Sequence, residues 1–257
     1  MNFVISLNTA IDRRKHIKNE FEKYNINYKF FDAVNKATLQ DYQNKFGIIF
    51  NDEKFMSSEK ACFLSHVALW DYCVSHNLEY IAVFEDDIYL SVNAKKLLNN
   101  FNRIPRGLDL IKLEKFEDAV LMSFKKINIQ DEFVLRLLKC KHLGTAGYIL
   151  SNKAARLLIN QVRGSIQENP IDELIFNLNI QNNFLSVHQL VPSLVMQADK
   201  LGVGKLCSQI QLERANRVTS IKKIKKNFSY KIKNEYIRVM KQFKMIFCKI
   251  QFDLGDK

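Results

Sequence analysis

The stretch that most constrains the fold lies at residues 80–90, where a buried-strand pattern runs directly into three consecutive acids. The run Tyr80–Phe84 is mostly β-branched or aromatic, which is typical of an interior strand of a sheet that is covered on both faces. In open α/β sheets, ligands bind at the carboxyl ends of such strands. The sequence therefore predicts an α/β fold with Glu85, Asp86 and Asp87 at a ligand-binding edge.

These three acids also predict a metal site. Three like charges at one strand end repel one another unless a cation or basic groups neutralise them. Carboxylate oxygens suit Mg²⁺ or Mn²⁺, and a partly hydrated ion bridges nucleotide phosphates with only one or two protein carboxylates. We therefore expect a nucleotide–metal site at Glu85, Asp86 and Asp87. A solvated acidic turn is the alternative that this tripeptide alone leaves open.

Short apolar runs alternate with amphipathic segments elsewhere in the chain, as in βα units with a parallel sheet. Strands are expected at Phe3–Leu7, Tyr28–Ala33, Leu108–Leu113, Phe133–Leu138 and Leu185–His188, and helices at 8–24, 57–70, Asn93–Asn102 and Lys153–Arg163. His66 and Trp70 share a helix face, and a lone histidine there is more typical of packing than of catalysis. Arg13 follows the first strand, where it would bind a pyrophosphate or simply begin a solvated helix.

The net charge of +12 would suggest nucleic-acid binding if it were evenly spread. Residues 222–257 hold eleven Lys or Arg against three acids, so +8 lies there and +4 in the first 221 residues. Apolar residues recur every three or four positions from Ile221 to Ile250, with lysines between them. We therefore expect one folded domain at 1–220 and a basic amphipathic helical tail at 221–257 that lies on an anionic membrane. A partner-binding or nucleic-acid-binding helix is the alternative.

Cysteine usage and the start of the chain indicate the compartment. The five cysteines are odd in number, widely spaced and without a CxxC pair, which favours reduced thiols in a cytoplasmic protein over a cysteine-based zinc site. The run Met1–Leu7 meets Asp12–Lys15 at once, so it predicts a strand and not a signal peptide. No apolar stretch approaches the length of a membrane span.

Several motifs taken together resemble glycosyltransferase family 25, the bacterial lipooligosaccharide galactosyltransferases whose wider family includes the collagen galactosyltransferases. In chain order they are Val4–Leu7 followed by Arg13 and Arg14, Glu59–His66, Ile81–Asp87, Gly144–Ser151, and Ile171 with Asp172. They follow the family order over roughly residues 1–200, and their conjunction is specific where each motif alone is not.

The resemblance implies a GT-A-like fold, a Rossmann-type mixed sheet flanked by helices. It implies transfer of galactose from UDP-galactose to a terminal sugar of lipooligosaccharide or lipopolysaccharide, with inversion at the anomeric carbon, as in a β-galactosyltransferase. It also implies Mn²⁺ or Mg²⁺ at the acidic motif and a peripheral location on the cytoplasmic face of the inner membrane. No nucleic-acid partner is expected.

Roles for single residues follow from the resemblance. An inverting displacement needs a general base for the acceptor hydroxyl, and Asp172 is the first candidate, with Glu173 second. Nucleotide contacts are expected from Asn8, Arg13, Ser57, Glu59 and Lys60. The sugar or acceptor pocket is expected to be lined by Gly144, Thr145, Ala146 and Tyr148, and further metal ligands are sought at His188 and Gln197–Asp199.

Two other functions are compatible with parts of the sequence. A metal-dependent phosphohydrolase or nucleotidyltransferase would keep the acidic metal site and change the chemistry. A non-catalytic binder of anionic surfaces, such as RNA, would depend on the basic tail and lose affinity steeply with salt. The nearly neutral body that carries the motifs argues against this binder.

Overall fold

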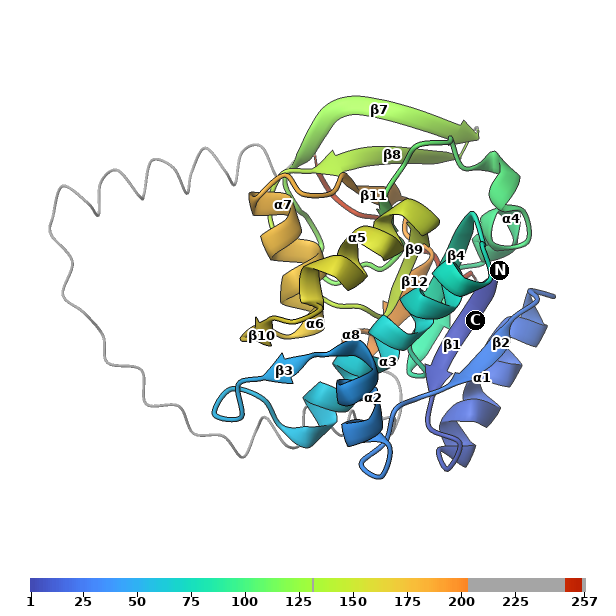
Figure 1. Cartoon of the computed structure of the whole chain (residues 1–257). Coiled ribbons are helices and arrows are strands. Elements are labelled where there is room, and N and C mark those ends of the chain that lie inside the picture. Colours follow the sequence, from blue (N-terminus) through green and yellow to red (C-terminus); the bar gives the residue numbers. More distant parts are fainter. Residues whose placement is uncertain (131, 203–247, 256–257) are drawn as a thin grey trace, which may run out of the picture.

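The computed structural model of the chain describes residues 1–130, 132–202 and 248–255 (Figure 1). Its centre is an eight-stranded mixed sheet in the order β2-β1-β4-β9-β6-β11-β8-β7. The strands of this sheet are β1 (Asn2–Ser6), β2 (Lys29–Asp32), β4 (Tyr80–Phe84), β6 (Leu110–Lys112), β7 (Met122–Gln130), β8 (Phe133–Leu138), β9 (Gly147–Ser151) and β11 (Val187–Val191). Two small sheets pair β3 (Ile49–Phe50) with β10 (Ile166–Gln167), and β5 (Ile88–Leu90) with β12 (Val195–Gln197).

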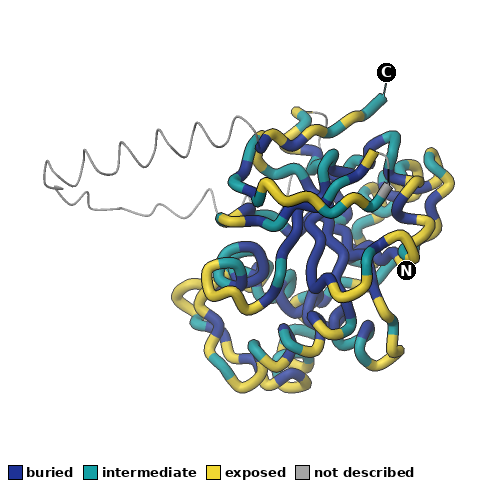
Figure 2. Tube along the Cα trace, turned by 90° about the horizontal axis from the view of Figure 1, so that it is seen from above, coloured by how far each residue is buried: buried dark blue, intermediate teal, exposed yellow. Residues whose placement is uncertain are grey.

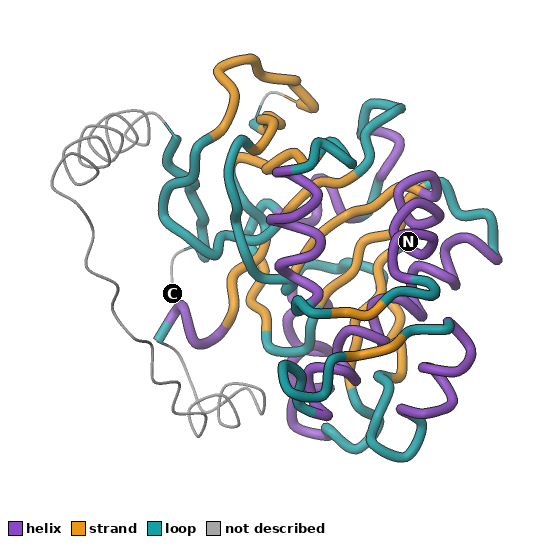
Figure 3. The backbone as a smooth tube through the Cα atoms, turned by 60° about the vertical axis from the view of Figure 1, so that its left-hand side comes forward, coloured by secondary structure: helices purple, strands orange, loops and turns teal. Residues whose placement is uncertain are grey.

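Helices surround the strands, which cross the middle of the molecule (Figure 3). They are α1 (Ile11–Lys23), α2 (Leu39–Phe46), α3 (Ser57–Ser75), α4 (Ala94–Leu98), the 3₁₀ turn η1 (Phe101–Arg103), α5 (Asn152–Val162), α6 (Ile171–Glu173), the π turn η2 (Leu174–Leu178), α7 (Asn179–Gln181) and α8 (Ala198–Leu201). The predicted α/β class, with a mixed sheet flanked by helices, is confirmed.

The middle strands are buried on both faces, as their apolar runs predict (Figure 2). Alternate side chains point to opposite faces of a strand, so β1 serves two cores. Phe3 packs in the core that contains α3 and α5, and Val4 packs in the core that contains Phe21 of α1 and Phe84 of β4. Each face of the sheet is therefore covered by helices, and the site has to lie at a strand end.

Strand direction decides which ends meet. β1 runs parallel to both β2 and β4, with Val4 opposite Phe84 in the register. Parallel neighbours end on the same edge of the sheet, so Ser6 at the end of β1 lies beside the acids that follow β4. β9 runs antiparallel between β4 and β6, and the loop that precedes it arrives at this same edge.

Two segments differ from the prediction. The helix expected at Asn93–Asn102 is broken into α4 and η1, because the Asn100 side chain accepts a hydrogen bond from the Asn102 backbone and competes with the helical pattern. β7, which the sequence pattern did not reveal, pairs with β8 at the sheet edge and carries lysines, as exposed edge strands often do.

The predicted tail at 221–257 is corrected at its end. Residues 221–247 lie outside the described residues, but residues 248–255 pack on the body. Ile250, expected on the apolar stripe of the tail helix, is only 3 % exposed and its backbone N–H donates to the Asp118 carbonyl. The Val92 N–H likewise donates to the Asp253 carbonyl. Any tail helix therefore ends before Cys248.

Within the described ranges, no helix combines the length and the apolar character that crossing a bilayer requires.

Candidate active site

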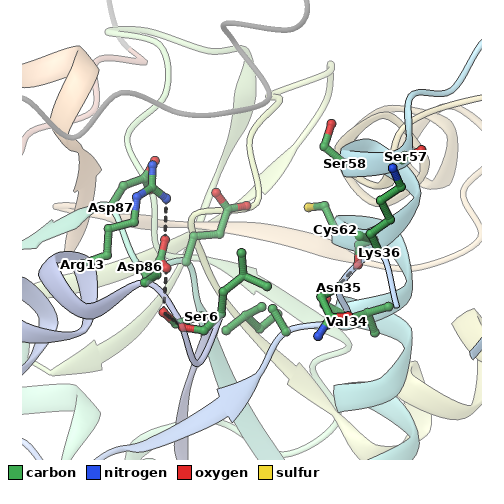
Figure 4. A pocket seen from close by; sticks show the side chains of 17 residues that line it. Ser6, Arg13, Val34, Asn35, Lys36, Ser57, Ser58, Cys62, Asp86 and Asp87 are labelled. Carbon is green, nitrogen blue, oxygen red and sulfur yellow. Dashed lines mark hydrogen bonds and ion pairs between the residues drawn. The ribbon is translucent and has the colours of Figure 1, made fainter. Parts of the chain in front are cut away.

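A cavity of about 410 Å³ opens where β1 and β4 end (Figure 4). Arg13, Asp86 and Asp87 lie on one side of it, and Ser57, Ser58 and Cys62 of α3 lie on the other. Its volume is in the range of small-ligand pockets, about 300–1,000 Å³. The three acids of the sequence motif all line it, so the structure brings the predicted metal residues to the predicted sheet edge.

Asp86 of the acidic motif is bound by two other side chains of the protein. Its Oδ2 accepts a hydrogen bond of 2.7 Å from the Ser6 hydroxyl, and its Oδ1 accepts one of 2.6 Å from the Arg13 guanidinium. These partners come from the end of β1 and from α1, so Asp86 joins two elements to the end of β4. Because the Arg13 guanidinium already neutralises its charge, Asp86 is less available to a cation than Asp87.

Asp87 is buried and its Oδ1 has no hydrogen-bond partner among the described residues. Burial and the nearby carboxylates of Glu85 and Asp86 raise the pKa of Asp87 to about 7, although the Arg13 charge opposes this. A buried carboxylate oxygen without a partner is costly unless it is paired. A divalent cation would supply both the missing partner and the missing charge, so the residues present fit such an ion.

Glu85 is oriented from two directions. Its Oε1 accepts a hydrogen bond of 2.6 Å from the Thr145 hydroxyl, and its Oε2 accepts one of 3.3 Å from the Gln197 amide. Burial alone would raise the pKa of Glu85, but the nearby His66, the Thr145 hydroxyl and the Lys112 charge bring it below its ordinary value. Glu85 is therefore held as a carboxylate at the cavity.

A buried ion pair holds the loop before β9 in place. Lys112 and Glu114 are fully buried, with 2.9 Å between Nζ and Oε2, and Lys112 also donates to the Gly144 carbonyl at 2.5 Å. Glu114 Oε2 accepts from the Ala146 backbone N–H at 3.2 Å. This pair fixes the backbone on both sides of Thr145, and through Thr145 it sets the position of Glu85.

Gly144 is required by this arrangement. Its φ of +87° lies in the left-handed region, and a Cβ atom there would meet the Glu114 carboxylate oxygens at 2.6 Å. The glycine thus allows close approach to a protein carboxylate. This explains the first glycine of the sequence motif without a direct contact to ligand.

The two candidate bases differ in their surroundings. Asp172 is half-buried, and its Oδ2 lies 3.4 Å from the Gly144 backbone nitrogen. Glu173 accepts a hydrogen bond of 2.6 Å from Asn177, one turn along its own segment. Asp172 therefore borders the loop that holds Glu85, whereas the contacts of Glu173 are local.

The other predicted binding residues separate into two groups. Ser57 and Arg13 line the cavity, whereas Asn8 is exposed in the turn after β1. Glu59 is not a lining residue, because its carboxylate accepts from the Met56 backbone N–H and caps α3. Lys60 forms an ion pair with Asp52 outside the cavity.

Within the motif at 144–148, the Thr145 side chain contacts the carboxylate of Glu85. The prediction that Tyr148 lines the sugar or acceptor pocket is corrected, because Tyr148 is fully buried. Its hydroxyl lies 2.9 Å from both His66 Nδ1 and Trp70 Nε1. Ala146 is also fully buried, and its contribution is made by its backbone groups, which bind Glu85 and Glu114.

Sequence reasoning missed several residues of the site. Ser6 and Lys36 line the cavity, and the ion pair of Lys112 and Glu114 holds the loop next to it. The spacing of Lys112 and Glu114 offered a signal, because two opposite charges at alternate positions of an apolar strand share one face and have to be paired when buried. Gln197 was considered as a metal ligand, and the structure places it on Glu85 instead.

Comparison with known proteins identifies the family to which the chain belongs. The family model of glycosyltransferase family 25, described as an LPS biosynthesis protein, matches residues 1–175. The lipooligosaccharide biosynthesis protein lex-1 of Haemophilus influenzae is 31% identical over 279 residues, covering 95% of this chain and 92% of its own. The lacto-N-neotetraose biosynthesis glycosyltransferase LgtB of Neisseria meningitidis serogroup B is 33% identical, covering 76% of this chain and 74% of its own.

Among solved structures, mouse xyloside xylosyltransferase 1 matches with a TM-score of 0.39 and 13% identity, covering 73% of this chain and 71% of that one. A likeness this distant carries no argument about the site. The family match covers more than half of the chain, and the relatives align over most of their own length. The chain therefore belongs to glycosyltransferase family 25, which confirms the resemblance seen in its motifs and makes the protein a glycosyltransferase.

Proposed function

We propose that this protein is an inverting, metal-dependent β-galactosyltransferase that moves galactose from UDP-galactose to a terminal sugar of lipooligosaccharide or lipopolysaccharide. The roles of lex-1 and LgtB in lipooligosaccharide and lacto-N-neotetraose biosynthesis support the acceptor class. The observation that carries the metal-dependent part is the buried, unpartnered Oδ1 of Asp87 at a cavity of nucleotide size. A GT-A-like donor site at the ends of β1 and β4 is consistent with both.

The cavity offers the groups that a nucleoside diphosphate needs. Arg13 and Lys36 bring positive charge to its wall. Ser57 and Ser58 form the first turn of the 19-residue helix α3, and the backbone N–H groups of a helix N-terminus bind phosphate. The apolar side chains of Ile5 and Val34 line the same cavity and offer a surface for a flat base.

Asp87 would hold the divalent cation, with Mn²⁺ or Mg²⁺ as the ions that oxygen ligands prefer. Such an ion, when bound, supplies positive charge that stabilises the diphosphate leaving group. Asp86 meanwhile keeps its contacts to Ser6 and Arg13, and these fix the strand end on which Asp87 sits. Glu85 remains a carboxylate between Thr145 and Gln197, where it can orient a sugar hydroxyl.

Asp172 is the proposed general base. In an inverting displacement a carboxylate removes the proton of the acceptor hydroxyl as that oxygen attacks the anomeric carbon. Asp172 is partly exposed, and its Oδ2 lies against the backbone of Gly144, in the loop that positions Glu85. Glu173 is the weaker candidate because Asn177 already occupies its carboxylate.

Replacing Asp172 with asparagine tests the base. The variant keeps the shape of the side chain but cannot accept a proton, so kcat should fall by roughly 10²–10⁴ with little change in donor KM. Glu173→Gln is the matched control and should retain most of the wild-type kcat. Equal losses in both variants would remove Asp172 from its proposed role.

The reaction itself is tested by following UDP release from UDP-galactose with and without a lactose-type or GlcNAc-type acceptor. UDP formation that requires the acceptor, with UDP-glucose and UDP-GlcNAc turned over more slowly, is the expected result. Acceptor-independent hydrolysis would instead favour a metal-dependent phosphohydrolase. NMR of the product linkage distinguishes inversion from retention.

We also propose a cytoplasmic location in which residues 221–247 bring the enzyme to the anionic surface of the inner membrane. The lysines and apolar residues of this segment support the idea, and one domain at 1–220 would carry the chemistry. Replacing Lys222, Lys223, Lys225 and Lys226 with glutamine should weaken co-sedimentation with vesicles containing anionic lipid. Unchanged sedimentation at low salt would rule out this electrostatic docking.

A further inference from the structure

Three side chains with different ligand atoms converge on one wall of the cavity. Cys62 and His66 are four residues apart on α3, so they lie on the same helix face, and both are directed toward Glu85 of the acidic motif. The Cys62 sulfur, a ring nitrogen of His66 and a carboxylate oxygen of Glu85 all lie within 4.8 Å of one another. Cys62 lines the cavity, which gives an ion a path to this group.

His66 provides independent evidence for a ligand between the side chains of Cys62, His66 and Glu85. The side chain is 1 % exposed, its Nδ1 lies 2.9 Å from the Tyr148 hydroxyl, and its Nε2 has no hydrogen-bond partner among the described residues. That Nε2 faces Glu85, with 3.8 Å to Oε1. A buried ring nitrogen without a partner is costly, and it is directed at the point between the other two ligand atoms.

The surroundings of His66 suit a metal ligand. Histidine ligands are usually held through the second ring nitrogen, which fixes the ring and the tautomer. The Tyr148 hydroxyl can accept from His66 Nδ1 while it accepts from Trp70 Nε1 at 2.9 Å. In that tautomer His66 Nε2 carries a lone pair that points at the cavity.

We propose that Cys62, His66 and Glu85 form a second metal site, selective for zinc-class cations. Thiolate, imidazole and carboxylate together favour borderline-soft ions such as Zn²⁺, whereas the all-oxygen Asp87 site suits Mn²⁺ or Mg²⁺. Bonds of about 2.0–2.3 Å place tetrahedral ligand atoms roughly 3.3–3.7 Å apart. The observed His66–Glu85 separation of 3.8 Å is close to this, and all three ligand atoms lie within 4.8 Å of one another, so side-chain rotations would bring them to bonding positions. The fourth position would face the cavity.

This proposal departs from the expectation that a cysteine-based zinc site is disfavoured. That expectation considered only the spacing between cysteines, and here a single cysteine combines with a histidine one turn away and with an acid from another element. The consequence of the proposed zinc-class site for catalysis rests on the proposed function. Glu85 and Asp87 line the same cavity, so dications held at the two positions repel each other, and zinc-class ions should lower the affinity of the Asp87 site for Mn²⁺.

The test uses Co²⁺ as a spectroscopic substitute for Zn²⁺ on the purified full-length protein, and it needs no activity. Wild type should show a thiolate-to-cobalt charge-transfer absorption that Zn²⁺ abolishes. Cys62→Ser should lose this absorption and bind Zn²⁺ at least about tenfold more weakly. Cys140→Ser is the matched control, since this partly buried cysteine lies outside the cavity, and it should behave as wild type.

Asp87→Asn separates the two sites. Its cobalt thiolate absorption should persist, because the proposed zinc-class site uses no atom of Asp87. Loss of the absorption in Asp87→Asn would mean that one ion spans both groups, which contradicts a separate site. Absence of the absorption in wild type, or its persistence in Cys62→Ser, would overturn the proposal and leave His66 as a donor that only orients Glu85.

Discussion

Replacing Asp87 with asparagine is expected to lower kcat for galactose transfer by at least roughly 10²–10³ while the fold is kept. Asp87 offers a buried carboxylate oxygen that has no hydrogen-bond partner among the described residues, whereas Asp86 is already bound by Ser6 and Arg13. The asparagine amide is neutral, so the substitution removes the anionic ligand for the divalent cation. Steady-state kinetics over a range of Mn²⁺ concentrations measures the effect, and near-normal transfer would contradict the assignment of Asp87 as the metal ligand.

The same substitution should stabilise the metal-free protein. The pKa of Asp87 is raised from its ordinary 3.8 to about 7 by burial and by neighbouring carboxylates. The folded state therefore binds the proton more tightly than the unfolded state, and wild-type stability falls as the pH rises from about 4 to about 7. Asparagine has no such penalty, so in EDTA at pH 8 the variant should be more stable by on the order of a few kcal/mol.

Thermal unfolding distinguishes this effect from a general change in packing. The difference in stability between Asp87→Asn and wild type should shrink below about pH 5, and Mn²⁺ should raise the wild-type Tm more than that of the variant. Asp86→Asn is the matched control and should lose stability, because it weakens the ion pair with Arg13. A metal-free Asp87→Asn protein that is less stable than wild type at pH 8 would contradict the buried, unpaired carboxylate.

Replacing Lys112 with methionine should destabilise the protein by about 3–5 kcal/mol. Lys112 and Glu114 are both fully buried, and burial lowers the pKa of the lysine and raises that of the glutamate. Removal of the lysine leaves Glu114 without its charge partner and leaves the Gly144 carbonyl without its donor. Urea unfolding measures the loss, provided that the slope of the transition stays unchanged.

A double variant shows whether the loss comes from the unpaired charge. Lys112→Met combined with Glu114→Gln removes both charges, so it should recover a large part of the stability lost in the single variant. Activity should recover less, because Lys112 and Glu114 also hold the loop that positions Thr145 against Glu85. A double variant no more stable than Lys112→Met would show that the charge pairing is not the source of the loss.

Sequence reasoning reached the sheet and the acids for a physical reason. A strand buried on both faces has to be apolar along its whole length, so the run Tyr80–Phe84 can be recognised as an interior strand. Glu85–Asp87 directly follow it, and they therefore lie at the edge of the sheet where this strand ends. Motifs near Arg13 and Ser57 were placed correctly because they adjoin strand or helix ends that meet at the same edge. The local sequence pattern was sufficient for residues whose place in the fold follows from the periodicity of a strand or a helix.

Pattern alone did not separate residues that contact a ligand from residues that support them. Tyr148 belongs to a motif near the site, but strand alternation turns its side chain away from the cavity and onto His66. Glu59 caps its own helix, a role that depends on backbone geometry at Met56. His66 was expected only to pack, because the carboxylate that faces it lies 19 residues further along the chain. Contacts between elements decided the roles of Tyr148 and His66.

The most direct test of the nucleotide–metal site is isothermal titration of the purified protein with UDP, first with Mn²⁺ and then with EDTA. UDP should bind in the presence of Mn²⁺ and lose most of its affinity in EDTA, and the Asp87→Asn variant should show only the weak, metal-independent binding. Equal UDP affinity with and without the metal would contradict the proposed role of Asp87. No UDP binding under either condition would contradict the cavity between β1, β4 and α3 as the donor site.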